Sequence, residues 1–123
     1  MYLIRKESEY AIKIIKLLST FPENKILKLS EISNLEEISV NFAAKILRNL
    51  SKKKIVNSFR GSYGGYNLKK KKVTYYQIIK ATQGNIQIVK QNKKQTNEVT
   101  ENLLKIQDFC IEQLNSLKIS RPG

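Results

Sequence analysis

Residues 55–68 of the chain read IVNSFRGSYGGYNL. Glycine permits the backbone conformations that tight turns require, and the glycines at positions 61, 64 and 65 therefore predict two short strands joined as a β-hairpin. The strands are expected to anchor on the core through Phe59, Tyr66 and Leu68. The tip of the hairpin is expected to expose Arg60, Ser62 and Tyr63.

The segment just before the hairpin, residues 39–54, predicts an amphipathic helix with Ser39 as its N-cap. One face carries apolar residues at helical spacing: Ala43, Ile46, Leu47 and Leu50. The other face repeats polar and basic residues: Asn41, Lys45, Arg48 and Lys52. A brief helix, capped by Ser30 and reaching about Leu35, is expected before it. Two short helices in a row, the second with a basic face, are typical of a helix-turn-helix whose second helix enters the DNA major groove.

Further small elements are expected around this pair of helices. Residues 8–20 predict an amphipathic helix, and its buried positions are Ala11, Ile14, Ile15 and Leu18. Residues 26–29 are long enough only for a short strand. After the lysine run Lys69–Lys72, Thr74 can cap a helix that ends at Gly84-Asn85. The alternation in residues 86–89 is too short to assign.

The C-terminal part of the chain predicts one long helix. Residues 90–96 are polar and are expected to form a linker, and the helix is expected from about Asn97 to Lys118. Apolar residues recur along it at spacings of three and four: Val99, Leu103, Ile106, Cys110, Leu114 and Leu117. Such a seam needs a partner, and a second copy of the chain is the economical one. We therefore expect a DNA-binding domain over residues 1–89, a linker over 90–96 and a dimerisation helix over 97–119.

The charge of the chain points to a polyanionic partner. Its 123 residues are enough for one compact domain, and its net charge is +13. Residues 38–97 carry fourteen Lys or Arg and no Asp or Glu. Such a surface attracts phosphates and makes nucleic-acid binding steeply salt-dependent. No apolar run approaches the ~18 residues of a membrane span, and the first residues lack a signal-peptide pattern, so we expect a cytoplasmic protein with no membrane contact.

Few residues suit catalysis or metal binding. The chain has no His, one Cys and a single Asp at position 108. A lone Cys excludes an intrachain disulfide and every multi-cysteine metal motif. The closest pair of carboxylates, Glu36 and Glu37, are neighbours that do not face each other on a helix. We therefore expect neither an enzyme nor a metal cofactor.

Several of these residues admit two interpretations. Asn41 could read an adenine through a bidentate pair, or support the helix cap. Arg60 suits a narrow minor groove, although it could be an exposed strand end. The run Lys69–Lys72 either solvates a loop or contacts backbone phosphate. Cys110 is most simply an apolar residue of the seam, and the alternative is a redox switch made by two thiols across a dimer axis.

Four short motifs follow one another along the chain: Tyr10-Ala11, Leu29-Ser30-Glu31-Ile32, Ile38-Ser39 and, at residues 60–68, Arg-Gly-x-x-Gly-Gly-Tyr-x-Leu. In these motifs the chain resembles the Rrf-two (Rrf2) family of bacterial winged-helix regulators, which includes IscR, NsrR and CymR. The resemblance runs from Met1 to about Gly84, and the glycine-rich motif is its most specific part.

The resemblance implies a homodimeric transcription factor whose third helix reads the major groove, whose wing enters the minor groove and whose long C-terminal helices form the dimer. Combined with the basic helix face, it gives the expected DNA-contacting residues: Ser39, Asn41, Lys45, Arg48, Lys52, Arg60, Ser62, Tyr63, Gly64 and Gly65. Ala44 occupies a position where several members have a base-reading Glu. The operator is therefore expected to differ from theirs.

Cluster-binding members of the family carry three cysteines before or at the start of the long helix, where this chain has residues 90–95 without a single Cys. One thiolate per chain, without His, cannot supply the four ligands of an iron–sulfur cluster. The resemblance thus implies a cluster-free member, similar in that respect to CymR. It also leaves open a regulatory protein partner for this chain, beside duplex DNA and a second copy of the chain.

The sequence predicts a mainly α protein with a small β-hairpin wing, that is, a winged helix-turn-helix with a long C-terminal dimerisation helix. The expected function is that of a sequence-specific repressor that binds an inverted repeat of duplex DNA as a homodimer. One alternative is a non-specific nucleic-acid binder, including an RNA-binding winged helix. The ratio of the affinities for operator and random duplex distinguishes this alternative from a sequence-specific regulator. The other alternative is a protein-interaction module, against which the unopposed basic residues argue.

Overall fold

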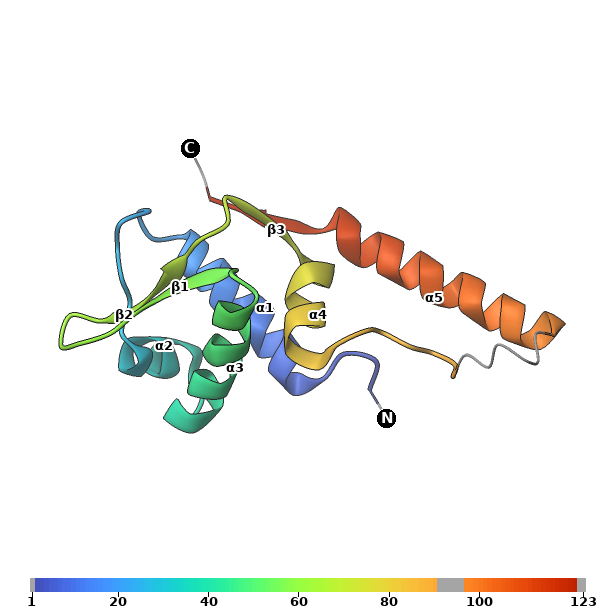
Figure 1. The fold of residues 1–123 in the computed structure, drawn as a ribbon, viewed down its shortest axis with the longest axis horizontal. Helices are drawn as coiled ribbons and strands as arrows, with labels where there is room; N and C mark the ends of the chain where they lie inside the picture. Colours follow the sequence, from blue (N-terminus) through green and yellow to red (C-terminus); the bar gives the residue numbers. More distant parts are fainter. Residues whose placement is uncertain (1, 91–96, 122–123) are drawn as a thin grey trace.

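The structure is a computed structural model that describes residues 2–90 and 97–121. Along these residues the elements follow in the order α1 (Lys6–Ser19), α2 (Leu29–Glu36), α3 (Val40–Lys52), β1 (Val56–Phe59), β2 (Gly65–Leu68), β3 (Lys72–Thr74), α4 (Tyr75–Gln83), α5 (Glu98–Ser116) and β4 (Lys118–Ser120). Helices α1 to α4 and the β1–β2 hairpin gather in one body, and α5 extends away from it (Figure 1). The expected mainly α fold with a small β-hairpin is confirmed.

The core of the body lies where α1 packs against α3 and α4. The buried positions expected on α1 are confirmed: Ala11, Ile14, Ile15 and Leu18. The buried stripe expected on α3 is confirmed as well: Ala43, Ile46, Leu47 and Leu50. Helix α4 contributes Ile78 and Ile79, which are fully buried. Each large aliphatic side chain removed from water contributes about 1.5–3 kcal/mol, so this three-helix contact dominates the stability of the fold.

Polar side chains set the ends of the helices. The Ser39 hydroxyl accepts a hydrogen bond from the Phe42 N–H at 3.1 Å, so the N-cap expected for α3 is confirmed. Thr74 caps α4 in the same way by accepting from the Gln77 N–H at 3.1 Å. Gln77 Oε1 accepts the Thr74 N–H in return, at 2.9 Å. Gly84 ends α4 at a φ of +85°, which glycine adopts without strain.

The prediction that Ser30 caps α2 is wrong. The helix begins one residue earlier, at Leu29, and Lys28 stands at its N-cap position. The Glu31 carboxylate accepts the Lys28 backbone N–H at 3.0 Å, and it thereby satisfies a donor that a Ser30 cap would have left to solvent. Of the strand expected over residues 26–29, only a single bridge remains, between Leu27 and Tyr66.

The expected β-hairpin is confirmed, with β1 and β2 antiparallel and Val56 opposite Leu68. Leu27 lies beside the hairpin, and its N–H and carbonyl exchange hydrogen bonds of 2.9 and 2.8 Å with Tyr66. Leu68 is buried and Tyr66 packs on the core, as expected. The prediction that Phe59 is a third anchor on the core is wrong, because 42% of this residue is exposed. It stands opposite Gly65, which offers no side chain to pack against, at the end of the hairpin farthest from the core.

A second small sheet joins β3 to β4 and was not expected from the sequence. Helix α5 ends at Ser116 rather than at Lys118, and the chain then runs antiparallel to β3 with Val73 opposite Ile119. Both of these side chains are buried. The lysine run thus ends inside β3, and the C-terminal end of α5 is tied to the body.

The unassigned residues 86–89 also attach α5 to the body. Ile86 is buried, and the Ile88 N–H donates to Oε1 of the buried Gln107 at 2.7 Å. Of the expected linker, residues 91–96 lie outside the described residues.

Replacing Gly65 with alanine is expected to destabilise the fold. A Cβ at this position would stand 2.3 Å from the Leu27 carbonyl oxygen and 2.9 Å from Ile26 Cγ2. Because the obstructing atom belongs to the backbone, Gly65→Ala should cost about 2–3 kcal/mol, as overpacking does. Thermal unfolding followed by circular dichroism should show a midpoint lower by roughly 6–10 °C.

Gly61→Ala is the matched control. Gly61 has a φ of +96°, and a Cβ added there would meet nothing within 4 Å, so it carries only the cost of the backbone conformation. A midpoint for Gly65→Ala no lower than that of Gly61→Ala would contradict the close contact with Leu27.

Candidate nucleic-acid interface

The polar face of α3 is on the surface, as expected. The four side chains that repeat along it are all exposed: Asn41, Lys45, Arg48 and Lys52. Ser39 is also exposed at the start of the helix, where its hydroxyl is engaged by the Phe42 N–H. Since the opposite face of the same helix is fully buried, the core contact itself turns these basic side chains to solvent.

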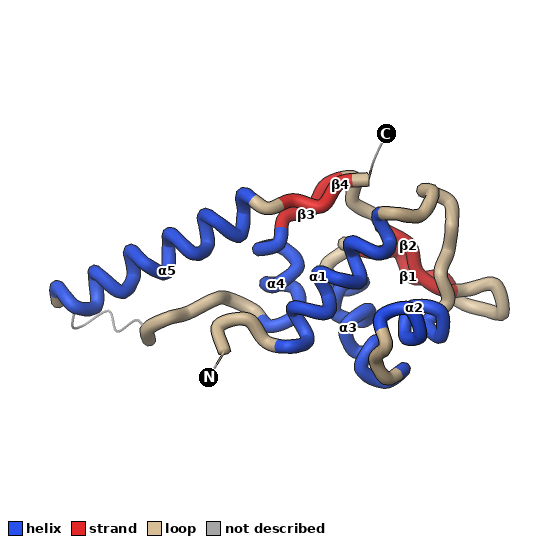
Figure 2. Tube along the Cα trace, turned by 180° about the vertical axis from the view of Figure 1, so that it is seen from behind, coloured by secondary structure: helices blue, strands red, loops and turns tan. Residues whose placement is uncertain are grey.

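The hairpin tip is exposed as expected, and Tyr63 is 91% accessible. Arg60 and Ser62 are exposed beside it. The hairpin tip lies at the same end of the molecule as α2 and α3, the end away from α5, in both Figure 1 and Figure 2. The basic helix face and the tip can therefore meet one extended ligand.

Unlike the other expected contact residues, Gly64 and Gly65 are at least partly buried. The Gly64 N–H donates to the Gly61 carbonyl at 2.9 Å, and a Cβ on Gly64 would stand 2.3 Å from the Phe59 oxygen. Gly65 is buried under Leu27. In this structure both glycines shape the turn, and they present no side chain to a ligand.

A hollow of about 260 Å³ separates α3 from the hairpin. Its lining residues come from both elements: Ala44, Arg48, Ser51, Lys52, Ser58 and Tyr66. Arg48 and Lys52 therefore stand at the border between the helix and the hairpin, and they extend the basic surface from one element to the other.

One expected contact residue already has an ionic partner. The Lys45 ammonium lies 3.2 Å from Oε2 of Glu7, which belongs to the first turn of α1. The sequence pattern of α3 does not indicate this pair, because the acidic partner lies 38 positions earlier in the chain. The Tyr10 and Phe42 rings hold the two helices together through an edge contact, with centroids 5.9 Å apart.

Two lysine runs lie close together at the base of the hairpin. Residues 52–54 start at the last residue of α3, and residues 69–72 follow β2. The Lys69 N–H donates to the carbonyl of Ile55 at 2.9 Å, which brings the start of one run next to the end of the other. Such a concentration of ammonium groups strengthens phosphate binding without reading sequence.

The outer face of α5 is apolar and has no partner among the described residues. Its exposed side chains are Val99, Ile106, Phe109 and Leu117. The other three residues of the expected seam are half-buried at its edge: Leu103, Cys110 and Leu114. Phe109, which is 60% exposed, was missed because the expected seam steps four residues from Ile106 to Cys110, although Phe109 lies three residues after Ile106. The inner face packs on the body through the buried Gln107.

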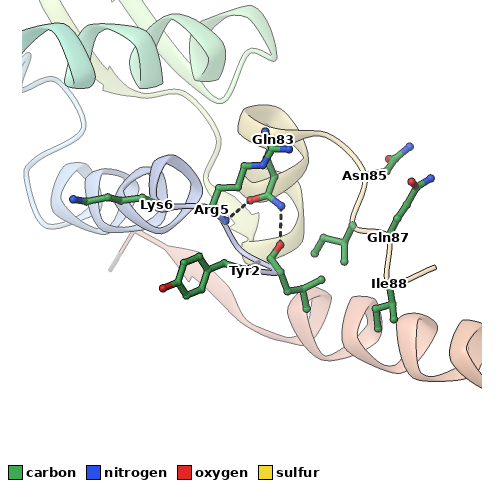
Figure 3. A pocket seen from close by; sticks show the side chains of 9 residues that line it. Tyr2, Arg5, Lys6, Gln83, Asn85, Gln87 and Ile88 are labelled. Atoms are coloured by element: carbon green, nitrogen blue, oxygen red, sulfur yellow. Dashed lines mark hydrogen bonds between the residues drawn. The ribbon is translucent and has the colours of Figure 1, made fainter. Parts of the chain in front are cut away.

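A hollow of about 740 Å³ lies between the N-terminal residues and the segment after α4 (Figure 3). Gln83 spans it by accepting the Arg5 backbone N–H at 2.8 Å and donating to the Leu3 carbonyl at 2.9 Å. The hollow is lined by cationic, amide and aliphatic side chains and by the phenol ring of Tyr2, with no carboxylate, imidazole or thiol among them. Its chemistry is that of a structural contact between the N-terminus and α4.

Within residues 2–90 and 97–121 there is no group of three or more His, Cys, Asp or Glu that could hold an ion. Over the whole sequence there is one Cys and no His. Among the helices that the structure describes, none is long and apolar enough to cross a membrane.

Comparison with known proteins places the chain among transcriptional regulators. The Rrf2 family, described as iron-dependent transcriptional regulators, matches residues 4–119. The HTH-type transcriptional regulator NsrR of Shouchella clausii is 23% identical over 92 residues, which cover 73% of this chain and 62% of the relative. NsrR of Halalkalibacterium halodurans is also 23% identical over 92 residues, with 73% and 63% covered. The chain thus spans less than two thirds of the length of these relatives.

Solved structures extend the likeness along the fold. CymR, the global cysteine regulator of B. subtilis, has a TM-score of 0.82 and 25% identity, with 96% of this chain and 93% of that chain covered. IscR of T. potens has a TM-score of 0.75 at 19% identity, with 94% and 81% covered, and this likeness concerns the fold alone. The winged-helix fold expected from the sequence is confirmed by these matches.

Proposed function

The chain belongs to the Rrf2 family of DNA-binding transcriptional regulators, and from that premise we propose that it is a repressor that binds an inverted-repeat operator as a homodimer. The observation that carries the proposal is the shared end of the molecule at which α3 and the hairpin tip lie, both with exposed basic side chains. Helix α3 has the length and the polar face of a helix that enters a major groove. Arg60 at the tip suits the narrow minor groove beside it. Because its proposed ligand is chromosomal DNA, we expect the regulator to act in the cytoplasm.

A second copy of the chain is the proposed partner of α5. An apolar face with Val99, Ile106 and Phe109 exposed is costly to leave in water. Pairing two such faces about a two-fold axis would bury them and would place two α3 helices on one duplex, which matches an inverted repeat.

We propose that this member works without an iron–sulfur cluster. Its family is described as iron-dependent, but one thiolate per chain and no imidazole do not fit the usual four ligands of a cluster. The signal would then have to be a small ligand, a protein partner or the oxidation of Cys110, which is half-buried at the edge of the apolar face.

Two other functions differ from the proposal in what they bind. A non-specific nucleic-acid binder, including one for RNA, would use the same basic surface without preferring a sequence. A protein-interaction module would dock through the outer face of α5 and would not need the basic face of α3. Binding measured on several duplex sequences distinguishes the three functions: a specific regulator prefers one sequence, a non-specific binder binds all sequences alike, and an interaction module binds none of them.

The experiment that tests the proposal is the selection of duplex fragments from the source genome by the purified protein at near-physiological salt. A repressor should enrich a short inverted repeat, and a reporter placed behind that repeat should be silenced when the protein is expressed. Uniform weak recovery of all fragments would contradict sequence-specific binding.

Lys45→Ala and Lys69→Ala are expected to act differently on binding. Losing a base contact at Lys45 should remove about 1–3 kcal/mol of discrimination between operator and random duplex. Losing a phosphate contact at the exposed Lys69 should weaken both duplexes alike and reduce the salt slope by about one. Fluorescence anisotropy at several salt concentrations measures both quantities. Equal effects of the two variants on the operator-to-random ratio would contradict the assigned roles.

Ile106→Glu is expected to convert the dimer to a monomer. Ile106 is 53% exposed on the outer face of α5, and a carboxylate buried there in a dimer would lack a partner. Lys105→Glu introduces the same residue one position away on the exposed polar side, and it should leave the dimer intact. Sedimentation velocity distinguishes the two states. A dimer that persists in Ile106→Glu would exclude this face as the interface.

A further inference from the structure

Glu7 is an acidic residue in direct contact with the candidate interface. Its carboxylate lies 3.2 Å from the Lys45 ammonium, and only 16% of the Glu7 side chain is exposed, against 60% for Lys45. The acidic partner is thus set into the protein surface, whereas the lysine reaches outward from it. The pair joins the first turn of α1 to the exposed face of α3.

Three features keep the Glu7 carboxylate in place. It belongs to the first turn of α1, where the helix dipole favours a negative charge. The Arg5 guanidinium lies 3.9 Å away on its other side. The edge contact between Tyr10 and Phe42 fixes α1 against α3 one turn further along. The carboxylate is therefore a fixed point from which Lys45 extends.

A fixed carboxylate changes what a lysine can do on DNA. An ammonium group has three N–H donors on a flexible stem, and a free lysine behaves as a mobile point charge. A mobile charge goes to the nearest phosphate, which carries no sequence information. When the Lys45 ammonium is paired with Glu7 at 3.2 Å, its position is restricted and its charge is partly offset. Its N–H donors then act from a defined position on the exposed face of α3.

We propose that Glu7 is a positioning residue that makes Lys45 a base-reading donor rather than a phosphate contact. This inference rests on the proposed function, because it concerns how the operator is told from other duplexes. The carboxylate contributes to specificity at the expense of general affinity, since it lowers the positive potential of the α3 face. It also keeps phosphate away from the N-terminus of α1, which would otherwise attract an anion.

The test replaces the Glu7 carboxylate with the isosteric amide. Glu7→Gln should lower the ratio of operator to random-duplex affinity by roughly three- to tenfold, within the discrimination that one base contact supplies. Affinity for the random duplex should rise at the same time, because the surface loses one negative charge. The probes are the duplex recovered by genomic selection and a scrambled duplex of the same composition, compared at the same salt concentration.

Glu9→Gln is the matched control. Glu9 belongs to the same first turn and makes the same charge change, but its partner is Lys13 on its own helix, at 3.6 Å. It should leave the ratio unchanged. A fall of the ratio in Glu9→Gln as large as in Glu7→Gln would overturn the proposal, because net charge alone would then explain the effect.

The Lys45→Gln background separates positioning from a structural role. If Glu7 acts through Lys45, Glu7→Gln should not change the ratio further once Lys45 has lost its charge. A purely structural role of Glu7 would weaken both duplexes alike and leave the ratio as it was, which would overturn the proposal. So would a fall of the ratio that persists in the Lys45→Gln background. A native protein that binds both probes equally would instead overturn the proposed function, and this inference with it.

Discussion

The burial of one face of α1 is the contact on which the rest of the structure depends. Ile14, Ile15 and Leu18 are almost completely removed from water between α3 and α4. At about 1.5–3 kcal/mol for each side chain, these three alone contribute an amount comparable with the whole net stability of a small domain, ~5–15 kcal/mol. Helix α1 also contacts β2 and β4. A change in its packing would therefore move the basic face of α3, the hairpin and the attachment of α5 together.

The features that could be predicted from the sequence are those whose signal lies inside one short segment. The buried stripe of α3, the caps at Ser39 and Thr74 and the glycine-rich turn each depend on residues within a few positions of one another. Local periodicity and capping chemistry are sufficient to find them. The same reasoning found the polar face of α3 and the exposed hairpin tip, which make up most of the candidate site.

Apart from the start of α2, where the local bond between Lys28 and Glu31 replaces the expected Ser30 cap, the features that were missed depend on contacts between separate segments. Strand β4 is only three residues long, and it exists because β3 offers a partner some 45 positions earlier in the chain. The exposure of Phe59 depends on its standing opposite Gly65, and the pairing of Lys45 depends on the packing of α1 against α3. The outward direction of Phe109 depends on which face of α5 the body covers. Such contacts are set by tertiary packing, and no pattern within either segment indicates them.

The way α5 is attached bears on how two copies could read one duplex. Gln107 ties its middle to the Ile88 backbone, and β4 ties its end to β3, so the helix is held against the body at two points. The rotation of α5 about its own axis is thereby defined, and Val99, Ile106 and Phe109 face outward in a set direction. If two copies pair through this face, the separation and tilt of their α3 helices follow from a chain of rigid contacts. A dimer built in this way would select the spacing of its half-sites, whereas a helix on a free tether would accept many spacings.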